Sequence, residues 1–159
     1  MQELPQDITT AIDQILQKFP ATPRQSAVIA ALMLVQKRNK GWLTTELMDL
    51  VADYLQIDRI IVYEVANFYS LFDLKPVGRH KIYVCTNLSC MLRGSEDVVN
   101  YLQEKLCVGL NQTTADGKFT LRAAECLAAC GGAPMMQIDE EYHENLTPEK
   151  INKILMEIE

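Results

Sequence analysis

Apolar side chains in the first part of the chain recur every three or four residues, a spacing typical of amphipathic helices. Four helices are predicted before residue 73. Pro20 ends the first, Pro23 opens the second, Thr44 or Thr45 caps the third, and Asp58 caps the fourth. The second helix is expected from Arg24 to Arg38, with apolar residues at 27–35. The apolar positions of the other helices are Ile8, Ile12, Ile15, Leu16 and Phe19 in the first, Leu47, Leu50, Val51 and Tyr54 in the third, and Ile61, Val65, Phe68 and Phe72 in the fourth.

The second predicted helix is apolar on all sides over nine consecutive residues, from Ala27 to Val35. Such a helix must be covered on most sides, either by neighbouring helices or by another protein. The run is also far shorter than the roughly 18 apolar residues that a membrane-spanning helix requires. The four helices are therefore expected to form a bundle around a common core.

The spacing changes after Lys75–Gly78, where proline and glycine interrupt the helical pattern. Strand-like and helical segments then follow. The expected strands are His80–Val84, Phe119–Ala124 and Met135–Ile138, and the expected helices are Gly94–Leu106 and a last one that starts at Thr147. The predicted fold class is α+β, with a helical bundle over residues 1–76 and a small β-α-β-β-α unit over residues 77–159.

Composition and charge narrow the class of function. Apolar residues make up 48% of the chain and charged residues 23%, as in ordinary globular proteins. A net charge of −6 without a basic block argues against nucleic acid or an anionic membrane as the main partner. The first residues lack the basic n-region of a secretory signal, so a cytoplasmic location is expected. Thiols stay reduced there, and clustered cysteines favour metal binding over disulfides.

Four of the five cysteines form two close pairs. Cys85 and Cys90 are separated by four residues, and Cys126 and Cys130 by three. Each pair follows a predicted strand, so both pairs are expected on loops at the same end of one sheet. Four converging thiolates suit either a tetrahedral zinc ion or an iron–sulfur cluster, and the spacing alone does not distinguish the two. In a two-iron cluster, each pair is expected to bind one iron.

The residues around the pairs favour the iron–sulfur interpretation. They form a small apolar shell, in which Gly131 and Gly132 are expected to adopt positive φ and to bring N–H groups against cluster sulfurs. No histidine stands beside either pair, and the third cysteine of a plant-type ferredoxin is absent. Cys107 ends an apolar helical stripe and is expected to be a buried structural thiol. The sequence leaves open whether the Ala133–Pro134 peptide is cis.

Several segments together carry a family resemblance; they are Phe68–Phe72, Pro76 with Gly78, Val84–Gly94, Glu125–Cys130 and Ala133–Met136. They resemble the thioredoxin-like [2Fe–2S] subunit of bacterial respiratory NADH:quinone oxidoreductase (complex I). The resemblance covers nearly the whole chain. It implies a thioredoxin-like ferredoxin domain after the helical bundle. It also implies one [2Fe–2S] cluster, held by Cys85, Cys90, Cys126 and Cys130.

The resemblance further implies docking on a flavin subunit that binds NADH and FMN, within the peripheral arm of a complex on the cytoplasmic side of the inner membrane. The aromatic group Phe68, Tyr69 and Phe72 is the expected interface. The chain itself shows no Gly-rich phosphate loop, so it is expected to transfer electrons without binding NADH. Two alternatives stay open: the equivalent subunit of an NAD-linked hydrogenase or formate dehydrogenase, and a zinc-stabilised interaction module.

Overall fold

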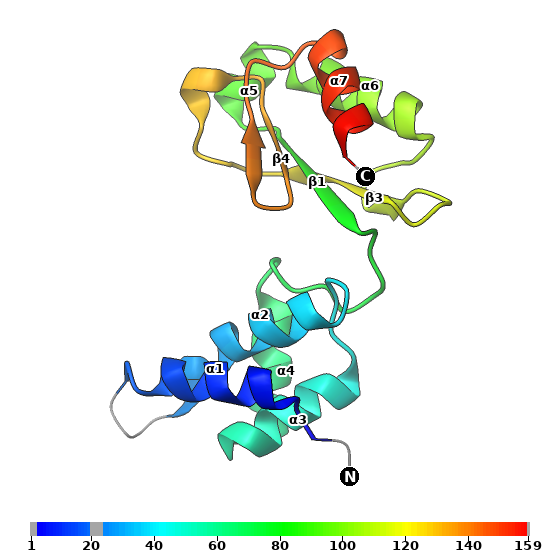
Figure 1. Cartoon of the computed structure of the whole chain (residues 1–159). Helices are drawn as coiled ribbons and strands as arrows, with labels where there is room; N and C mark the ends of the chain where they lie inside the picture. The colour runs from blue at the N-terminus through cyan, green and yellow to red at the C-terminus, as the bar shows by residue number, and fades with distance from the viewer. Residues whose placement is uncertain (1–2, 20–23, 159) are drawn as a thin grey trace. The chain divides into compact units, whose positions relative to one another are not determined.

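The structure is a computed structural model that describes residues 3–19 and 24–158. The chain divides into two compact units, one that ends at Pro76 and one that begins at Val77. Figure 1 shows the helices of the first unit and the mixed sheet and helices of the second. No helix in the described part of the chain is long and apolar enough to cross a membrane.

The first unit consists of helices, as the apolar spacing predicts. Their bounds are α1 (Gln6–Leu16), the short 3₁₀ helix η1 (Arg24–Ala27), α2 (Val28–Arg38), α3 (Thr45–Leu55) and α4 (Arg59–Phe68). All of them contribute to one apolar core, and helix α2 supplies several of its central residues. The fully buried side chains of this core include Ile12, Val28, Leu32, Leu43, Val51 and Leu55.

The ends of these helices differ from the prediction in several places. Thr44 caps α3 as expected, because its hydroxyl accepts a hydrogen bond from the Leu47 N–H at 3.2 Å. Asp58 stands at the cap position of α4 but makes no side-chain capping bond. Helix α1 ends at Leu16, so Phe19 lies beyond its apolar face and is exposed. The predicted roles of Pro20 and Pro23 fall outside the described residues.

Helix α4 ends at Phe68, one turn earlier than expected, because the following segment is held by a buried polar side chain. The amide of Gln36 donates to the Leu71 carbonyl at 3.0 Å and accepts from the Asp73 N–H at 2.7 Å. These bonds draw Phe72 into the helical core, where only 6% of it is exposed. The expectation that Phe72 forms part of an exposed interface is therefore wrong.

The second unit is built on a mixed five-stranded sheet in the order β2-β3-β1-β4-β5. Strands β1 and β3 are parallel, and the other neighbours are antiparallel. The bounds are β1 (His80–Cys85), β2 (Gln112–Thr113), β3 (Phe119–Ala124), β4 (Met136–Ile138) and β5 (Glu141–His143). The helices are α5 (Leu88–Leu92), α6 (Ser95–Leu106), the 3₁₀ helix η2 (Cys130–Gly132) and α7 (Pro148–Glu157).

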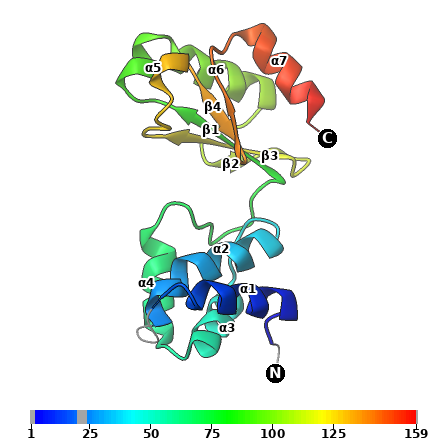
Figure 2. The same cartoon turned by 60° about the vertical axis from the view of Figure 1, so that its left-hand side comes forward.

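Helices α6 and α7 pack on one face of this sheet, as the turned view in Figure 2 shows. Alternate strand residues face them, which is the two-residue period of a half-buried sheet. The buried residues of this core include Ile82, Val84, Leu102, Leu121, Met136 and Ile151. The sequence missed β2, β5 and α5, each of five residues or fewer. Such short elements carry too few positions for a periodic pattern.

Candidate metal centre

The two cysteine pairs lie at the same edge of the sheet. The parallel register pairs Cys85, the last residue of β1, with Ala124, the last residue of β3. Cys126 follows two residues later. Strand β4 is antiparallel to β1 and begins at this edge, because Met136 pairs with Val84. The chain after Cys130 therefore also passes this edge, and the prediction that both pairs lie at one end of one sheet is confirmed.

Backbone hydrogen bonds hold the first pair in place. The Cys85 N–H donates to the Met135 carbonyl at 3.2 Å, and the Thr86 N–H donates to the Ala124 carbonyl at 3.0 Å. The Asn87 side chain accepts from the Leu88 N–H at 2.8 Å and starts helix α5. This helix carries Cys90 inward, so the local sequence turns the second thiol of the pair back toward the first.

The four thiols interact with one another although they come from different loops. The thiol of Cys85 is within hydrogen-bond reach of the thiols of Cys90 and Cys126. Cys90 also interacts electrostatically with Cys130. All five cysteines are free of disulfides. Within residues 3–19 and 24–158, no three His, Cys, Asp or Glu side chains meet at a point suited to a single metal ion.

The pKa values of the two inner thiols move in opposite directions. Burial raises the pKa of Cys90 to about 11, helped by the hydrogen bond to Cys85 and by the charges of Cys85 and Cys130. Burial also opposes ionisation of Cys85. Hydrogen bonds from the backbone N–H groups of Asn87 and Leu127 and from the neighbouring thiols outweigh that effect, so the pKa of Cys85 is lowered. Cys85 is thus the thiol that ionises more readily, and a metal would displace the proton of Cys90 on binding.

Burial divides the four cysteines into an inner and an outer pair. Cys85 and Cys90 are 3% and 1% exposed, whereas Cys126 and Cys130 are exposed. The inner thiols pack in a small apolar cluster with Ala133 and Met135, against which Leu127 and Ala129 are partly buried. This observation agrees with the apolar shell expected from the sequence. The site is therefore apolar within and open on the side of the outer pair.

The sequence did not identify the backbone N–H groups that point at sulfur. The donors to Cys85 are Asn87 and Leu127, and the Ala128 N–H donates to the Cys126 sulfur at 3.4 Å. The Met135 N–H donates to the sulfur of Cys90. Asn87 and Ala128 each stand two residues after the cysteine that they bond. Short polar side chains commonly accept a hydrogen bond from a backbone N–H at this spacing. The position two residues after a cysteine was therefore the signal from which these donors could have been predicted.

The glycines after Cys130 behave differently from the expectation. The prediction of positive φ is wrong for both Gly131 and Gly132, and the left-handed residue of this loop is Ala128, with φ of 58°. Both glycines lie in the turn η2, whose backbone any residue adopts, and the Gly132 N–H donates to the Ala129 carbonyl at 3.1 Å. The proposed approach of the Gly131 N–H to a cluster sulfur stays a prediction.

Gly132 is instead required by packing. A Cβ atom at this position would lie 2.3 Å from Oε2 and 2.5 Å from Cβ of Glu144. A Cβ at Gly131 would meet nothing within 4 Å. The two neighbouring glycines therefore have unlike reasons to be glycine. The peptide bond that follows, between Ala133 and Pro134, is cis, which answers the question that the sequence left open.

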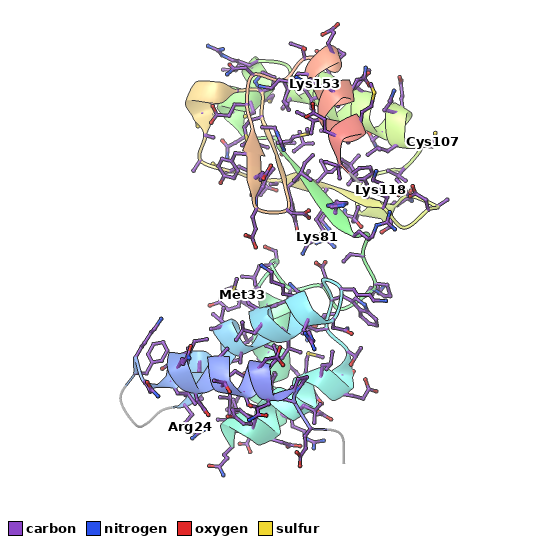
Figure 3. The ribbon with its side chains drawn as sticks, in the orientation of Figure 1. Arg24, Met33, Lys81, Cys107, Lys118 and Lys153 are labelled. Atoms are coloured by element: carbon purple, nitrogen blue, oxygen red, sulfur yellow. The ribbon has the colours of Figure 1, made fainter. Side chains whose placement is uncertain are left out.

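Cys107 lies at the end of α6, as Figure 3 shows, and takes no part in the cysteine cluster. The expectation that it is buried is wrong, because the thiol is exposed and donates to the Glu104 carbonyl at 3.5 Å. The helix ends here with φ of 53°, a left-handed turn that carries Cys107 off the apolar stripe. Its position therefore gives no support to a role as a metal ligand.

An exposed apolar surface lies on the helix that carries Cys90. Helix α5 presents Leu88, Met91 and Leu92 with exposures of 61%, 52% and 75%. These positions are spaced i, i+3 and i+4, so they share one side of the helix, whereas Cys90 on the same helix is buried. Exposed apolar residues that adjoin one another are typical of surfaces that bind another protein. We call Leu88, Met91 and Leu92 the α5 face.

The donor set fits an iron–sulfur cluster. Thiolates are the ligands of such clusters, and backbone N–H groups directed at sulfur are the interactions that tune them. Here four thiols from two loops interact, and the inner two lie in apolar surroundings. At least four backbone N–H groups bond three of the four sulfurs. Neither His80 nor His143 takes part. His80 instead bonds the Asp139 carboxylate at 2.7 Å.

Known proteins resemble this chain in sequence and fold. Residues 12–159 match the model of the family described as thioredoxin-like [2Fe–2S] ferredoxin. A subunit of the NADH-quinone oxidoreductase of Rickettsia conorii, the one designated E, is 45% identical over 143 residues, which are 90% of this chain and 86% of that protein. The mitochondrial NADH dehydrogenase [ubiquinone] flavoprotein 2 of Dictyostelium discoideum is 40% identical over 153 residues, 96% of this chain and 62% of that one.

A solved structure shares the fold at lower identity. The air-oxidized NAD⁺-reducing [NiFe]-hydrogenase superimposes with a TM-score of 0.72 at 20% identity, over 86% of this chain. The chain spans about a quarter of that hydrogenase chain (24%). At this identity the likeness concerns the fold alone, and it agrees with the α+β class predicted from the sequence.

Proposed function

This chain belongs to the thioredoxin-like [2Fe–2S] ferredoxin family, and we propose that it is the electron-transfer subunit of an NADH–quinone oxidoreductase. In this role Cys85, Cys90, Cys126 and Cys130 hold one [2Fe–2S] cluster. The observation that supports the proposal is that four thiols from two loops interact in pairs, with the inner two, Cys85 and Cys90, in apolar surroundings. The names of the similar proteins favour a quinone-linked complex over a hydrogenase or formate dehydrogenase.

A bound [2Fe–2S] cluster supplies one-electron chemistry. The chain's own residues set the conditions for it. The inner thiols of Cys85 and Cys90 sit in an apolar pocket that excludes water, and the N–H groups of Asn87 and Leu127 favour the ionised form of Cys85. We assign Cys85 and Cys90 to one iron and Cys126 and Cys130 to the other, because each pair comes from one short loop.

Electron exchange requires a partner to approach the outer thiols. Cys126 and Cys130 are exposed, and the α5 face lies on the helix that carries Cys90, another ligand of the proposed cluster. A partner that covers this face buries Leu88, Met91 and Leu92, which favours association. It also removes water from the site and brings the electron donor close to the cluster. We therefore assign the α5 face to the docking of the subunit that binds FMN and oxidises NADH.

The helical unit offers a second apolar surface. Phe68 is 80% exposed and stacks edge-on against Tyr69, with ring centroids 5.0 Å apart. Asn67, the residue before Phe68, lines a groove of about 560 Å³ together with Trp42 and Leu74. Clustered aromatic residues are common anchors of interfaces. We assign Phe68 and Tyr69 to contacts within the complex, which would hold the protein at the cytoplasmic side of the inner membrane.

The identity of the metal centre is tested on the purified chain supplied with iron and sulfide. A brown protein with visible charge-transfer bands, equal iron and sulfide, and an EPR signal only after one-electron reduction is the expected result. NADH should reduce it only when the flavin subunit is present. A colourless protein that retains zinc would overturn the proposal and support the zinc-stabilised interaction module instead.

The docking assignment is tested with a matched pair of methionines. Met91 lies on the α5 face and is 52% exposed, and Met156 lies on α7 and is 78% exposed. Met91→Gln should weaken binding to the purified flavin subunit at least several-fold, with the visible spectrum unchanged, and Met156→Gln should not. Equal binding by both variants and the unmodified chain would remove the α5 face from the interface.

The parent complex is identified by isolating the native assembly through a tag on this chain. Co-purification of quinone-reductase subunits is the expected result. Recovery of hydrogenase or formate dehydrogenase subunits would instead support the alternative assignment.

A further inference from the structure

The hairpin of β4 and β5 carries a carboxylate to the edge of the sheet where the cysteines lie. Strand β5 runs back along β4, with Ile138 opposite Glu141 and Met136 opposite His143. Met136 itself pairs with Val84, next to Cys85. Glu144 therefore leaves the sheet at the cysteine edge, whereas Glu141 lies near the opposite end.

The segment that begins at Glu144 is bonded to the loop after Cys130. The Asn145 N–H donates to the Gly132 carbonyl at 2.6 Å, and the Leu146 N–H donates to the Pro134 carbonyl at 3.0 Å. The Lys150 ammonium donates to the backbone carbonyl of Glu144 and further fixes the segment. These bonds hold the backbone of Glu144 beside the loop.

The Glu144 carboxyl group lies directly over this loop. Its Oε2 and Cδ atoms would be 2.3 and 2.4 Å from a Cβ atom built on Gly132, two residues after Cys130. Gly132 is the residue that permits this approach, since any side chain there would occupy the place of the carboxylate. Gly132 is buried, whereas Glu144 itself is exposed to solvent.

From this geometry we propose that Glu144 is a positioning residue whose negative charge lowers the reduction potential of the cluster; this inference rests on the proposed function. Reduction adds one electron, and hence one negative charge, to the site. A carboxylate beside the ligand loop disfavours that added charge. The interaction is partly exposed to solvent, so salt weakens it. The role differs from that of the backbone N–H groups, which favour the reduced state.

The test compares two isosteric charge removals in the loaded chain. Glu144→Gln keeps the packing over Gly132 and removes the charge. Glu141→Gln makes the same change in the same hairpin, about 10 Å farther from the cysteine edge, given three residues at about 3.3 Å each. Midpoint potentials are measured by EPR-monitored redox titration at low and at high salt, together with iron and sulfide content and the visible spectrum.

Glu144→Gln should shift the midpoint potential to a more positive value at low salt, by clearly more than Glu141→Gln does, and the shift should shrink at high salt. The iron and sulfide content and the visible spectrum of Glu144→Gln should match those of the unmodified chain. If Glu144 had only a structural role, the substitution would change the content or the spectrum. Equal potentials for Glu144→Gln and the unmodified chain at low salt, or equal shifts in both variants, would overturn the inference. An unmodified chain that takes up no iron and sulfide would instead refute the proposed function.

Discussion

Two neighbouring residues of the same type can occupy their positions for different structural reasons. The two glycines after Cys130 are the clearest case in this protein. Gly131 has open space where a side chain would lie, and Gly132 has Glu144. Because Gly132 has no Cβ atom, the loop after Cys130 can pack closely against the segment that begins at Glu144. This loop carries Cys130, a cysteine of the proposed site. Substitution by alanine separates the two cases.

Gly132→Ala should destabilise the second unit by about 1–3 kcal/mol, as overpacking of a filled site does. The Cβ atom of Glu144 takes part in the clash, so rotation of the carboxylate alone does not relieve it. Gly131→Ala should be neutral or slightly stabilising, because alanine reduces the freedom of the unfolded chain. Urea denaturation measures both. The double variant Gly132→Ala with Glu144→Gly should recover much of the loss, and failure to recover would contradict the packing account.

The cysteines make a second contrast at this scale. Cys126→Ala should abolish the visible spectrum or leave a labile centre, because it removes one of the four interacting thiols. Cys107→Ala should keep the spectrum and the iron content, because that thiol is exposed at the end of α6. Absorbance and iron analysis after desalting check both variants. Loss of the cluster in Cys107→Ala would mean that the ligand set is assigned wrongly.

At the scale of elements, helix caps stabilise the two units separately. The Thr44 hydroxyl accepts from the Leu47 N–H at 3.2 Å and caps α3, and the Thr147 hydroxyl accepts from the Lys150 N–H at 3.3 Å and caps α7. Both caps were visible in the sequence, because threonine precedes an amphipathic run in each case and proline follows Thr147. Each cap belongs to a different compact unit.

Thr44→Ala and Thr147→Ala should each cost about 1 kcal/mol of unfolding free energy. The single tryptophan, Trp42, lies in the helical unit, so its fluorescence reports that unit. Absorbance of the cluster reports the second unit. We expect Thr44→Ala to shift mainly the fluorescence transition and Thr147→Ala mainly the absorbance transition. Identical shifts of both transitions in both variants would show that the units unfold as one.

At the scale of the whole molecule, the proposed metal ligands lie in the second unit and the proposed aromatic assembly surface lies in the first. All four paired cysteines lie after Val77, whereas Phe68 and Tyr69 lie before Pro76. The helical unit has its own apolar core and contributes no cysteine to the site. This division agrees with a first unit that serves assembly and a second unit that holds the cluster.

A chain that starts at Val77 should therefore still take up iron and sulfide with the same spectrum and EPR signal. It should bind the flavin subunit at least tenfold more weakly, because the surface of Phe68 and Tyr69 is lost. Binding is measured by calorimetry or surface plasmon resonance against the full chain. Normal affinity of the shortened chain would contradict an assembly role for the helical unit, and failure to load the cluster would contradict the independence of the second unit.

Features that depend on local pattern could be predicted from the amino-acid sequence alone. Periodic apolar residues specified the helices of the first unit and the strands β1, β3 and β4, because residues of one face recur at a spacing that neighbours in the chain define. Two close cysteine pairs, each after a predicted strand, predicted a thiolate metal site at one end of one sheet. These inferences required no knowledge of distant contacts.

Features that depend on residues far apart in the chain became clear only from the folded structure. Gln36 bonds Asp73 across 37 residues and so turns Phe72 inward, and Glu144 makes glycine necessary at Gly132. Packing of the sheet edge buries Cys85 and Cys90 and leaves Cys126 and Cys130 at the surface. Burial and close packing arise from the sum of many long-range contacts, and such contacts leave no periodic trace in the amino-acid sequence.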